Sequence, residues 1–213
     1  MTVEIVAGRE VTIYFEASRC IHARNCVLAD PEVYVPNVEG DWLRPDAASA
    51  EAVLRTGFNC PSGAIRVTRN ASGQGSDAAP TVNTVRVREN GPLAIEAELS
   101  IGDIKLATPR ATLCRCGQSA NKPYCDGAHA RADFSASGEP AIKAFEPLAA
   151  RNGPVNVAPT PDGPLVVTGN LEIVSGTGRT VNKVARVSLC RCGHSANKPY
   201  CDGSHKAAGF QAR

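Results

Sequence analysis

The sequence predicts an α+β protein made of one small α+β domain followed by two β-rich modules. The first observation is a 22-residue stretch, Leu113–Phe134, that recurs as Leu189–Phe210 with all but five positions identical. The second is a series of short segments in which apolar and polar residues alternate, as they do in half-buried strands. The third is a helical pattern in the N-terminal third of the chain, directly after Pro45.

The N-terminal domain is expected to cover residues 1–69. Val3–Val6 and Val11–Phe15 alternate apolar and polar residues on either side of a turn, which predicts a hairpin. A helix is expected from Asp46, a good capping residue after a proline, to about Thr56.

An internal repeat follows a linker. Residues 70–80 are rich in Gly, Ser, Ala and Asp without hydrophobic periodicity, so we expect a flexible linker there. A Gly-Pro-Leu sequence returns 72 positions later, which divides the rest into modules at 81–150 and 151–213, with Ser175–Gly178 as the expected insertion in the second. Strands are expected at Val82–Arg88, Leu93–Leu99, Val155–Val157, Leu165–Val167 and Val184–Val187.

Composition narrows the classes of function. The chain has 43% hydrophobic residues and a net charge of +2, so it lacks the basic surface typical of nucleic-acid binders. No apolar run approaches the ~20 residues that a spanning helix needs, and the N-terminus does not resemble a signal peptide. We therefore expect no nucleic-acid partner, no membrane association and a cytoplasmic location. Nothing resembles a catalytic triad, a phosphate loop or a nucleotide fingerprint, which argues against an independent enzyme.

Each copy of the repeated stretch carries Cys and His in the spacing C-x-C-x8-C-x3-H. Three thiolates and one imidazole can complete a metal site. Gly117 and Gly193 follow the C-x-C pairs and allow the backbone to loop around a metal. Asp126 and Asp202 follow the third cysteines and are expected to start a short helix that brings cysteine and histidine together. The candidate ligands are Cys114, Cys116, Cys125 and His129 in the first copy and Cys190, Cys192, Cys201 and His205 in the second.

These stretches resemble the CDGSH-type, or mitoNEET-like, iron–sulfur family, and the second copy reads Cys-Asp-Gly-Ser-His outright at 201–205. No ligand departs from the family pattern, and only Ala128 replaces its usual Ser. The resemblance implies one [2Fe-2S] cluster per copy, with the C-x-C pair on one iron and the other Cys and the His on the second. It also implies β-rich modules that pair about a two-fold axis. Because both modules lie on one chain, we expect an intrachain pseudo-two-fold dimer and a monomeric protein.

Two other uses of these cysteines compete with cluster binding. Three cysteines and a histidine also bind structural zinc, although zinc modules usually separate paired cysteines by two to four residues. A disulfide framework is disfavoured because the total of nine cysteines is odd and C-x-C neighbours do not bridge each other readily. The spacing therefore favours iron over zinc, and zinc over disulfides.

The N-terminal domain contains three further cysteines, Cys20, Cys26 and Cys60, the last of which precedes a proline. Together with a Pro-Glu-Val-Tyr sequence they resemble the single-cluster bacterial ferredoxins, except that Ala23 stands at the second ligand position. Three thiolates suit a [3Fe-4S] cluster. A [4Fe-4S] cluster would need a further ligand, for which His22 is the nearby candidate, although a polar residue at the cluster rim is its more ordinary role. Three core cysteines without metal are the alternative.

The sequence thus predicts an electron-transfer protein whose partner is an unidentified redox protein. A neutral histidine ligand makes a cluster less negative than four thiolates do, so the reduction potential is expected to lie above that of a plant-type ferredoxin. The alternative function is delivery of iron or clusters to apo-proteins, with the histidine-bound iron as the exit point. Arg115 and Arg191, between the C-x-C ligands, are expected to point outward.

Overall fold

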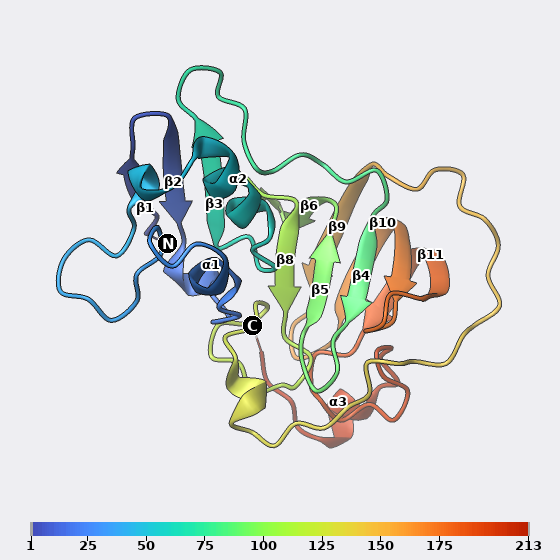
Figure 1. Cartoon of the computed structure of the whole chain (residues 1–213). Coiled ribbons are helices and arrows are strands. Elements are labelled where there is room, and N and C mark those ends of the chain that lie inside the picture. The colour runs from blue at the N-terminus through green and yellow to red at the C-terminus, as the bar shows by residue number, and fades with distance from the viewer. Residues whose placement is uncertain (1, 213) are drawn as a thin grey trace. The chain divides into compact units, whose positions relative to one another are not determined.

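The structure, a computed structural model, describes residues 2–212 and divides into two compact units. The first unit ends at Ala78 and the second begins at Ala79. Met1 and Arg213, the outer ends of the first and last expected domains, lie outside the described residues. The expected mixture of helices and strands is confirmed (Figure 1). Within the described residues, no helix combines the length and apolar character needed to cross a membrane.

The N-terminal unit is a three-stranded antiparallel sheet with short helices. Its strand order is β1-β2-β3, and the expected hairpin of β1 and β2 is present. Val11 and Ile13 on β2 are buried in its core. The elements are β1 (Glu4–Ala7), β2 (Val11–Phe15), a 3₁₀ turn (Ala17–Arg19), α1 (Asn25–Ala29), a second 3₁₀ turn (Pro45–Ala47), α2 (Ala50–Phe58) and β3 (Ile65–Arg69).

The main helix begins later than the sequence predicts. Asp46 lies in the preceding 3₁₀ turn, and its carboxylate accepts a hydrogen bond from the Arg9 amide at 2.8 Å. The N-cap of α2 is Ser49, whose hydroxyl oxygen accepts from the Ala52 amide at 3.3 Å. The prediction was wrong because Asp46 is engaged by a residue distant in sequence, while a second capping residue lies three positions further on.

Part of the expected linker folds back onto β3. The amide of Ser76 donates to the carbonyl of Val67 at 2.8 Å, and the Ser76 hydroxyl accepts from the Val67 amide at 3.1 Å. The Arg69 amide likewise donates to the carbonyl of Gln74 at 2.8 Å. Composition does not reveal this return, because Gly and Ser serve tight turns and flexible linkers equally well.

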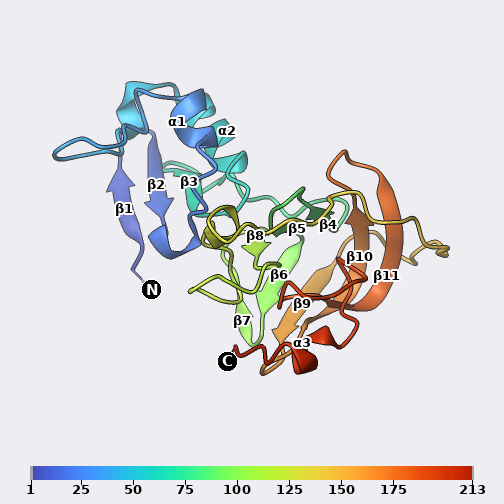
Figure 2. The ribbon, with the colours of Figure 1, turned by 90° about the horizontal axis from the view of Figure 1, so that it is seen from below.

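The second unit is built on one eight-stranded sheet. Its order is β7-β6-β9-β10-β4-β5-β8, with β11 paired to β10. Figures 1 and 2 show this sheet curled into an open half-barrel. All five expected strand segments overlap observed strands, although β10 and β11 are much longer than predicted. The strands are β4 (Thr84–Val87), β5 (Leu93–Glu96), β6 (Glu98–Ile101), β7 (Ile104–Lys105), β8 (Arg110–Leu113), β9 (Pro154–Pro159), β10 (Leu165–Val174) and β11 (Thr180–Leu189).

The two repeats exchange strand pairings across this sheet. Strand β4 of the first repeat pairs in parallel with the second half of β10, in the register Thr84↔Glu172. Strand β9 of the second repeat pairs in parallel with β6, in the register Asn156↔Ser100. The two registers are equivalent under the 72-position offset of the repeat. Each repeat therefore provides a strand that extends the sheet of the other.

A single buried cluster of aliphatic side chains joins the two repeats. Val85 lies opposite Ile173 in one exchanged pair, and Val157 lies opposite Ile101 in the other. All four side chains are buried and belong to the same cluster. Burying a side chain of this size contributes about 1.5–3 kcal/mol. The seam between the repeats is thus a large part of the stability of this unit.

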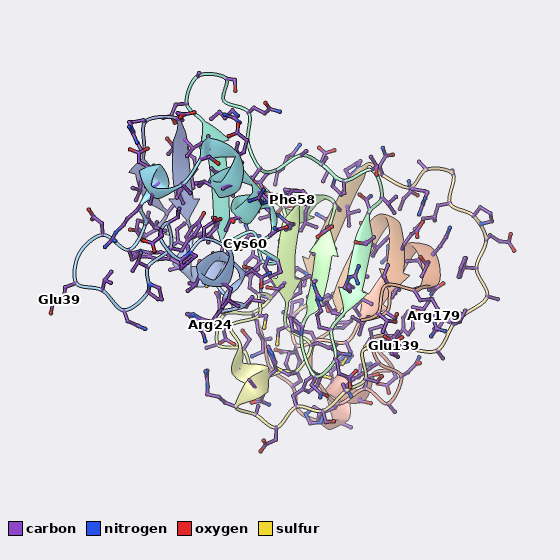
Figure 3. All side chains as sticks on the ribbon, in the orientation of Figure 1. Arg24, Glu39, Phe58, Cys60, Glu139 and Arg179 are labelled. Atoms are coloured by element: carbon purple, nitrogen blue, oxygen red, sulfur yellow. The ribbon has the colours of Figure 1, made fainter. Side chains whose placement is uncertain are left out.

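The four-residue insertion of the second repeat forms hydrogen bonds with the segment that follows the first motif. The Gly176 amide donates to the carbonyl of Gly138 at 2.8 Å, and the Thr177 amide donates to the Glu139 carboxylate at 2.9 Å. Arg179 adds an ion pair to Glu139 at 3.8 Å, and both residues are labelled in Figure 3. Ser175–Gly178 is thus the turn between β10 and β11, which agrees with its expected place.

Candidate metal centres

Each motif loop begins where a strand of the large sheet ends. Strand β8 leads into Cys114, and β11 leads into Cys190. The first loop then returns to its strand, because the Cys114 amide donates to the carbonyl of Pro123 at 2.8 Å and the Cys125 amide donates to that of Thr112 at 2.9 Å. The second loop repeats both bonds at the same lengths. Both loops lie beyond the same end of the sheet (Figure 1).

A carboxylate ties the two arms of each loop together. In the first loop, Asp126 accepts hydrogen bonds from the amides of Ala120 at 2.8 Å and Ala128 at 3.0 Å. Although desolvation opposes it, these bonds lower the pKa of Asp126. Asp202 accepts the equivalent bonds in the second loop, together with one from the Ser204 hydroxyl, and its pKa is lowered as well.

The helix expected after each third cysteine is a single turn that begins after a glycine. It spans Ala128–Ala130 in the first motif and forms α3, Ser204–Ala207, in the second. Gly127 and Gly203 precede these turns with φ of 82° and 91°, in the left-handed region. The aspartate therefore caps the turn from one position before the N-cap, which shifts the helix start relative to the prediction.

The four donors of each motif come as two close pairs. The sulfurs of Cys114 and Cys116 are 3.8 Å apart, and the sulfur of Cys125 is 3.4 Å from Nδ1 of His129. In the second motif the corresponding distances are 3.7 Å and 3.4 Å. Two ligands about 2.3 Å from one tetrahedral metal are separated by roughly 3.7 Å. Each pair thus has the spacing of two ligands on one metal atom.

This division into pairs fits a cluster of two metal atoms. A [2Fe-2S] cluster takes two protein ligands on each iron, whereas a lone tetrahedral ion needs all four donors around one point. The donor arrangement therefore matches the cofactor that the resemblance to CDGSH proteins implies.

The C-x-C end of each motif is buried, and the histidine end is partly exposed. Cys114 and Cys116 share a hydrogen bond, which lowers the pKa of Cys114 and raises that of Cys116. Desolvation lowers the pKa of His129 and thereby favours its neutral imidazole. A thiolate and a neutral imidazole are the forms that bind metal.

Arg115 and Arg191 are buried, contrary to the expectation that they point outward, since each is 1% exposed. The space around each guanidinium group is filled by backbone turns of the protein rather than by solvent. Arg191 donates to the carbonyls of Gly163, Thr160 and Ala212. Arg115 donates to the carbonyls of Gly91, Arg88, Ala136 and Ser137.

Each buried arginine also lies near a ligand of the other motif. Desolvation lowers the pKa of Arg115 to about 10, and the negative charge of Cys190 acts against that shift. Desolvation likewise lowers the pKa of Arg191, against the charge of Cys114. The positive charge of the arginine in each motif therefore acts on a cysteine of the other motif. A buried guanidinium near an anionic site stabilises negative charge there.

The two motif loops pack against each other backbone to backbone. A Cβ on Gly117 would collide with the carbonyl oxygen of Cys192, and a Cβ on Gly193 would collide with that of Cys116. Both glycines also have positive φ, 81° and 88°. The sequence predicts these glycines to be needed for the backbone freedom of their own loops. The structure adds a second requirement, because the backbone of the other motif lies too close to leave room for a side chain.

The three cysteines of the N-terminal unit line one pocket. Cys20 follows the first 3₁₀ turn, Cys26 lies in α1, and Cys60, labelled in Figure 3, follows α2. Ala23 and Ser62 also line this pocket. Burial raises the pKa of Cys20 and of Cys26, and the charge of the neighbouring Cys60 adds to both shifts. The fold therefore brings the three cysteines, which lie far apart in the sequence, to one pocket.

His22 takes a different position. Its side chain is exposed, and it is not among the residues that line the pocket. Its backbone amide donates to the sulfur of Cys20 at 3.4 Å, with φ of 55°. This is the placement of a polar residue at the rim of the site, which contributes through its backbone.

Comparison with known proteins identifies the same two regions. Residues 90–130 and 162–206 match the family described as "Iron-binding zinc finger CDGSH type". Residues 6–70 match the family described as "Divergent 4Fe-4S mono-cluster". Both are cluster- or iron-binding families rather than catalytic ones.

Individual relatives match parts of the chain. The chain is 30% identical over 60 residues to "Uncharacterized protein YjdI" of Escherichia coli strains K12 and O157:H7, a match that covers 28% of this chain and 76% of the relative. It is 29% identical over 93 residues to "CDGSH iron-sulfur domain-containing protein 2 homolog" of Drosophila ananassae, which covers 42% of this chain and 60% of that relative. The chain is thus an iron–sulfur binding protein that carries two CDGSH-type iron-binding motifs behind a divergent 4Fe-4S mono-cluster domain.

Proposed function

We propose that the chain is an electron carrier with two [2Fe-2S] clusters in its second unit and a third cluster in its first. The observation that carries the proposal is the contact between the C-x-C loops, Gly117 against Cys192 and Gly193 against Cys116. Adjoining centres in one folded unit are suited to electron exchange between them. The ligands would be Cys114, Cys116, Cys125 and His129 for one cluster and Cys190, Cys192, Cys201 and His205 for the other.

The protein groups around these sites favour electron uptake. When bound, each cluster supplies one-electron oxidation and reduction. The neutral histidine ligand leaves each site less negative than four thiolates would, and the positive charges of Arg115 and Arg191 act in the same direction. Both effects support a reduction potential above that of a plant-type ferredoxin.

In the N-terminal unit, Cys20, Cys26 and Cys60 would hold the third cluster. The matched family is described by a 4Fe-4S cluster, which supports a four-iron form. Ala23 lines the same pocket but offers no ligand atom, which supports a three-iron form that lacks the fourth iron. We propose that the oxidised protein holds [3Fe-4S] and that added ferrous iron under reducing conditions converts it to [4Fe-4S].

We also propose that the two repeats form a pseudo-two-fold dimer within one chain, so that the protein is a monomer in solution. The equivalent registers of the exchanged strands support this proposal, as do the reciprocal glycine contacts between the loops. Symmetric pairing of this kind buries the same patch of both partners.

Cluster or iron delivery is the second candidate function. It is favoured by the partial exposure of His129 and His205, which would place the histidine-bound iron of each cluster at the surface. A proton can displace an imidazole from a metal more readily than it displaces a buried thiolate, so this iron would be the first to leave.

One set of measurements tests these proposals. Iron and acid-labile sulfide analysis with EPR spectroscopy of the full chain should give two reduced [2Fe-2S] signals and an oxidised three-iron signal. Zinc in place of iron in protein made with adequate iron would contradict the proposal. Mixing with an apo-ferredoxin then separates the two functions, because delivery moves the visible absorbance to the acceptor whereas a carrier keeps its clusters and cycles rapidly with a reductase.

A further inference from the structure

Ser62 is a buried serine in the turn that contains the candidate ligand Cys60. The turn is closed by the Gly63 amide, which donates to the carbonyl of Cys60 at 3.2 Å. Pro61 occupies the second position of this turn, where its fixed φ is favourable, and Gly63 ends it with φ of 65°. The Ser62 residue is 2% exposed. The local backbone therefore holds a hydroxyl group beside a candidate ligand and away from bulk water.

The Ser62 hydroxyl has two hydrogen-bond partners of different chemistry. Its oxygen lies 3.3 Å from the backbone nitrogen of Ala64 and 3.7 Å from the sulfur of Cys60. An amide can only donate, so the hydroxyl oxygen accepts the bond from Ala64. The single hydrogen of the hydroxyl is left for the other partner. The pair of contacts thus assigns the direction of the second bond, in which Ser62 donates and the sulfur of Cys60 accepts.

The hydroxyl also belongs to the pocket that the candidate ligands share. Ser62 lines this pocket together with Cys20, Cys26 and Cys60. Apart from Arg24 and Asn25, the other lining residues are apolar, namely Ile21, Ala23, Pro61, Ala64 and Ile65. In surroundings of this kind a hydrogen bond is electrostatically stronger than the same bond in water. A hydroxyl directed at a ligand sulfur therefore has a large effect on the charge of that sulfur.

We propose that Ser62 donates a hydrogen bond to the ligand sulfur of Cys60 and thereby raises the reduction potential of the N-terminal cluster. The inference rests on the proposed third cluster, whose three candidate ligand residues line this pocket. Hydrogen bonds to ligand sulfurs are among the features that set the potential of iron–sulfur clusters, because they withdraw negative charge and favour the reduced state. Ser62 acts through the sulfur, so it is a positioning residue.

The test is Ser62→Ala in the full chain, with Ser76→Ala as a matched control. Ser76 is another buried serine of the N-terminal unit. Its hydroxyl likewise accepts from a backbone amide, that of Val67 at 3.1 Å, and donates to a nearby side chain, the Asp77 carboxylate at 3.3 Å. Ser76 is not among the residues that line the cysteine pocket. The control therefore removes a similar pair of hydrogen bonds elsewhere in the same unit.

Three measurements are made on each protein. EPR-monitored redox titration gives the potential of the N-terminal cluster. Electron–nuclear double resonance in D₂O reports exchangeable deuterons near its irons. Thermal melting of the metal-free chain reports the stability of the fold. The backbone amide of His22, which donates to the sulfur of Cys20 at 3.4 Å, is an internal reference for the deuteron couplings, because neither substitution removes it.

We expect Ser62→Ala to keep the iron content of the N-terminal site, to lower its potential and to lose one exchangeable-deuteron coupling, while the coupling of the His22 amide remains. Ser76→Ala should change neither the potential nor the couplings. Both metal-free variants should melt below the wild-type protein, because each loses a hydroxyl that bonds a backbone amide.

Several outcomes would overturn the inference. An unchanged potential or an unchanged set of couplings in Ser62→Ala would remove the bond to the sulfur, and a metal-free Ser62→Ala chain that melts as the wild type does would remove the bond to Ala64 that assigns its direction. An equal fall in potential in Ser76→Ala would attribute the effect to general loosening of the unit. Loss of iron from Ser62→Ala would show that the serine is required for binding and not for tuning. A wild-type chain with no cluster on Cys20, Cys26 and Cys60 overturns the proposed third cluster itself, which the iron count of the wild type distinguishes.

Discussion

The backbone of Gly117 lies against the carbonyl oxygen of Cys192, although the two residues belong to different motifs 76 positions apart. The reverse contact joins Gly193 to Cys116. Neither glycine is required only by its own loop. A substitution of the glycine in one motif should therefore displace a ligand residue of the other.

Gly117→Ala should reduce cluster occupancy in the second motif as well as in the first. A side chain at φ of 81° costs about 1–3 kcal/mol, and its Cβ must also displace the Cys192 backbone. The measurement is made in a Cys125→Ser background, which removes the first cluster. The reduced [2Fe-2S] EPR signal then reports the second motif alone.

The control for this variant is Gly102→Ala in the same background. Gly102 has φ of 58°, but a Cβ there meets nothing within 4 Å, so the substitution carries backbone strain without a collision. It should leave the second cluster in place. Equal losses in the two variants would show that general destabilisation, and not the contact between the loops, explains the result.

Arg115→Lys should destabilise the second unit although it keeps the charge. A lysine ammonium cannot reproduce the planar guanidinium that bonds four carbonyls at once. Each buried carbonyl left unpaired costs about 1–3 kcal/mol. Thermal melting checks the expected loss against Arg131→Lys, at an exposed position just after the first motif, which should melt as the wild type does. Equal melting temperatures would contradict the structural role of the buried arginine.

His129→Cys should keep the first cluster, lower its potential and slow its loss in acid. A thiolate adds negative charge relative to imidazole and holds iron more tightly. Desolvation lowers the pKa of His129, so its neutral, ligating form persists to a lower pH than for an ordinary histidine and is lost as the pH falls further. Visible absorbance during acidification measures this loss. His194→Gln, which makes the second loop resemble the first, should not alter it, and a similar shift in that variant would remove the link to ligation.

The two repeats should stay together when the chain between them is cut. A protease site introduced at 146–149 lies in an exposed stretch, beyond Lys143, whose amide donates to the carbonyl of Val181 at 2.9 Å. After cleavage, the exchanged strands should keep the fragments associated in gel filtration. Light scattering of the intact chain should give one mass near 22.3 kDa. Separation of the fragments, or a stable dimer of the intact chain, would contradict the intrachain pairing.

Local patterns in the sequence were enough to predict the mixture of helices and strands and the N-terminal hairpin. They could not predict the parallel pairing of Thr84 with Glu172, because nothing in either short segment specifies a partner 88 positions away. Arg115 was misjudged for a similar reason, since the carbonyls that surround it come from turns outside the motif. Its identity in both copies, between two buried cysteines, is the signal that could have indicated a buried role.

The exchanged strands also set the order in which the protein can fold during translation. The first motif is complete in sequence at His129, but the strand that borders β4 and the backbone that packs on Gly117 are translated only with β10 and Cys192. Long-range parallel pairing of this kind forms late, because the loop-closure entropy comes before the contacts. The cysteines of the first motif are therefore expected to stay in a flexible part of the chain until most of the polypeptide has been synthesised. Iron loading should accordingly be a post-translational event, directed at a nearly finished polypeptide.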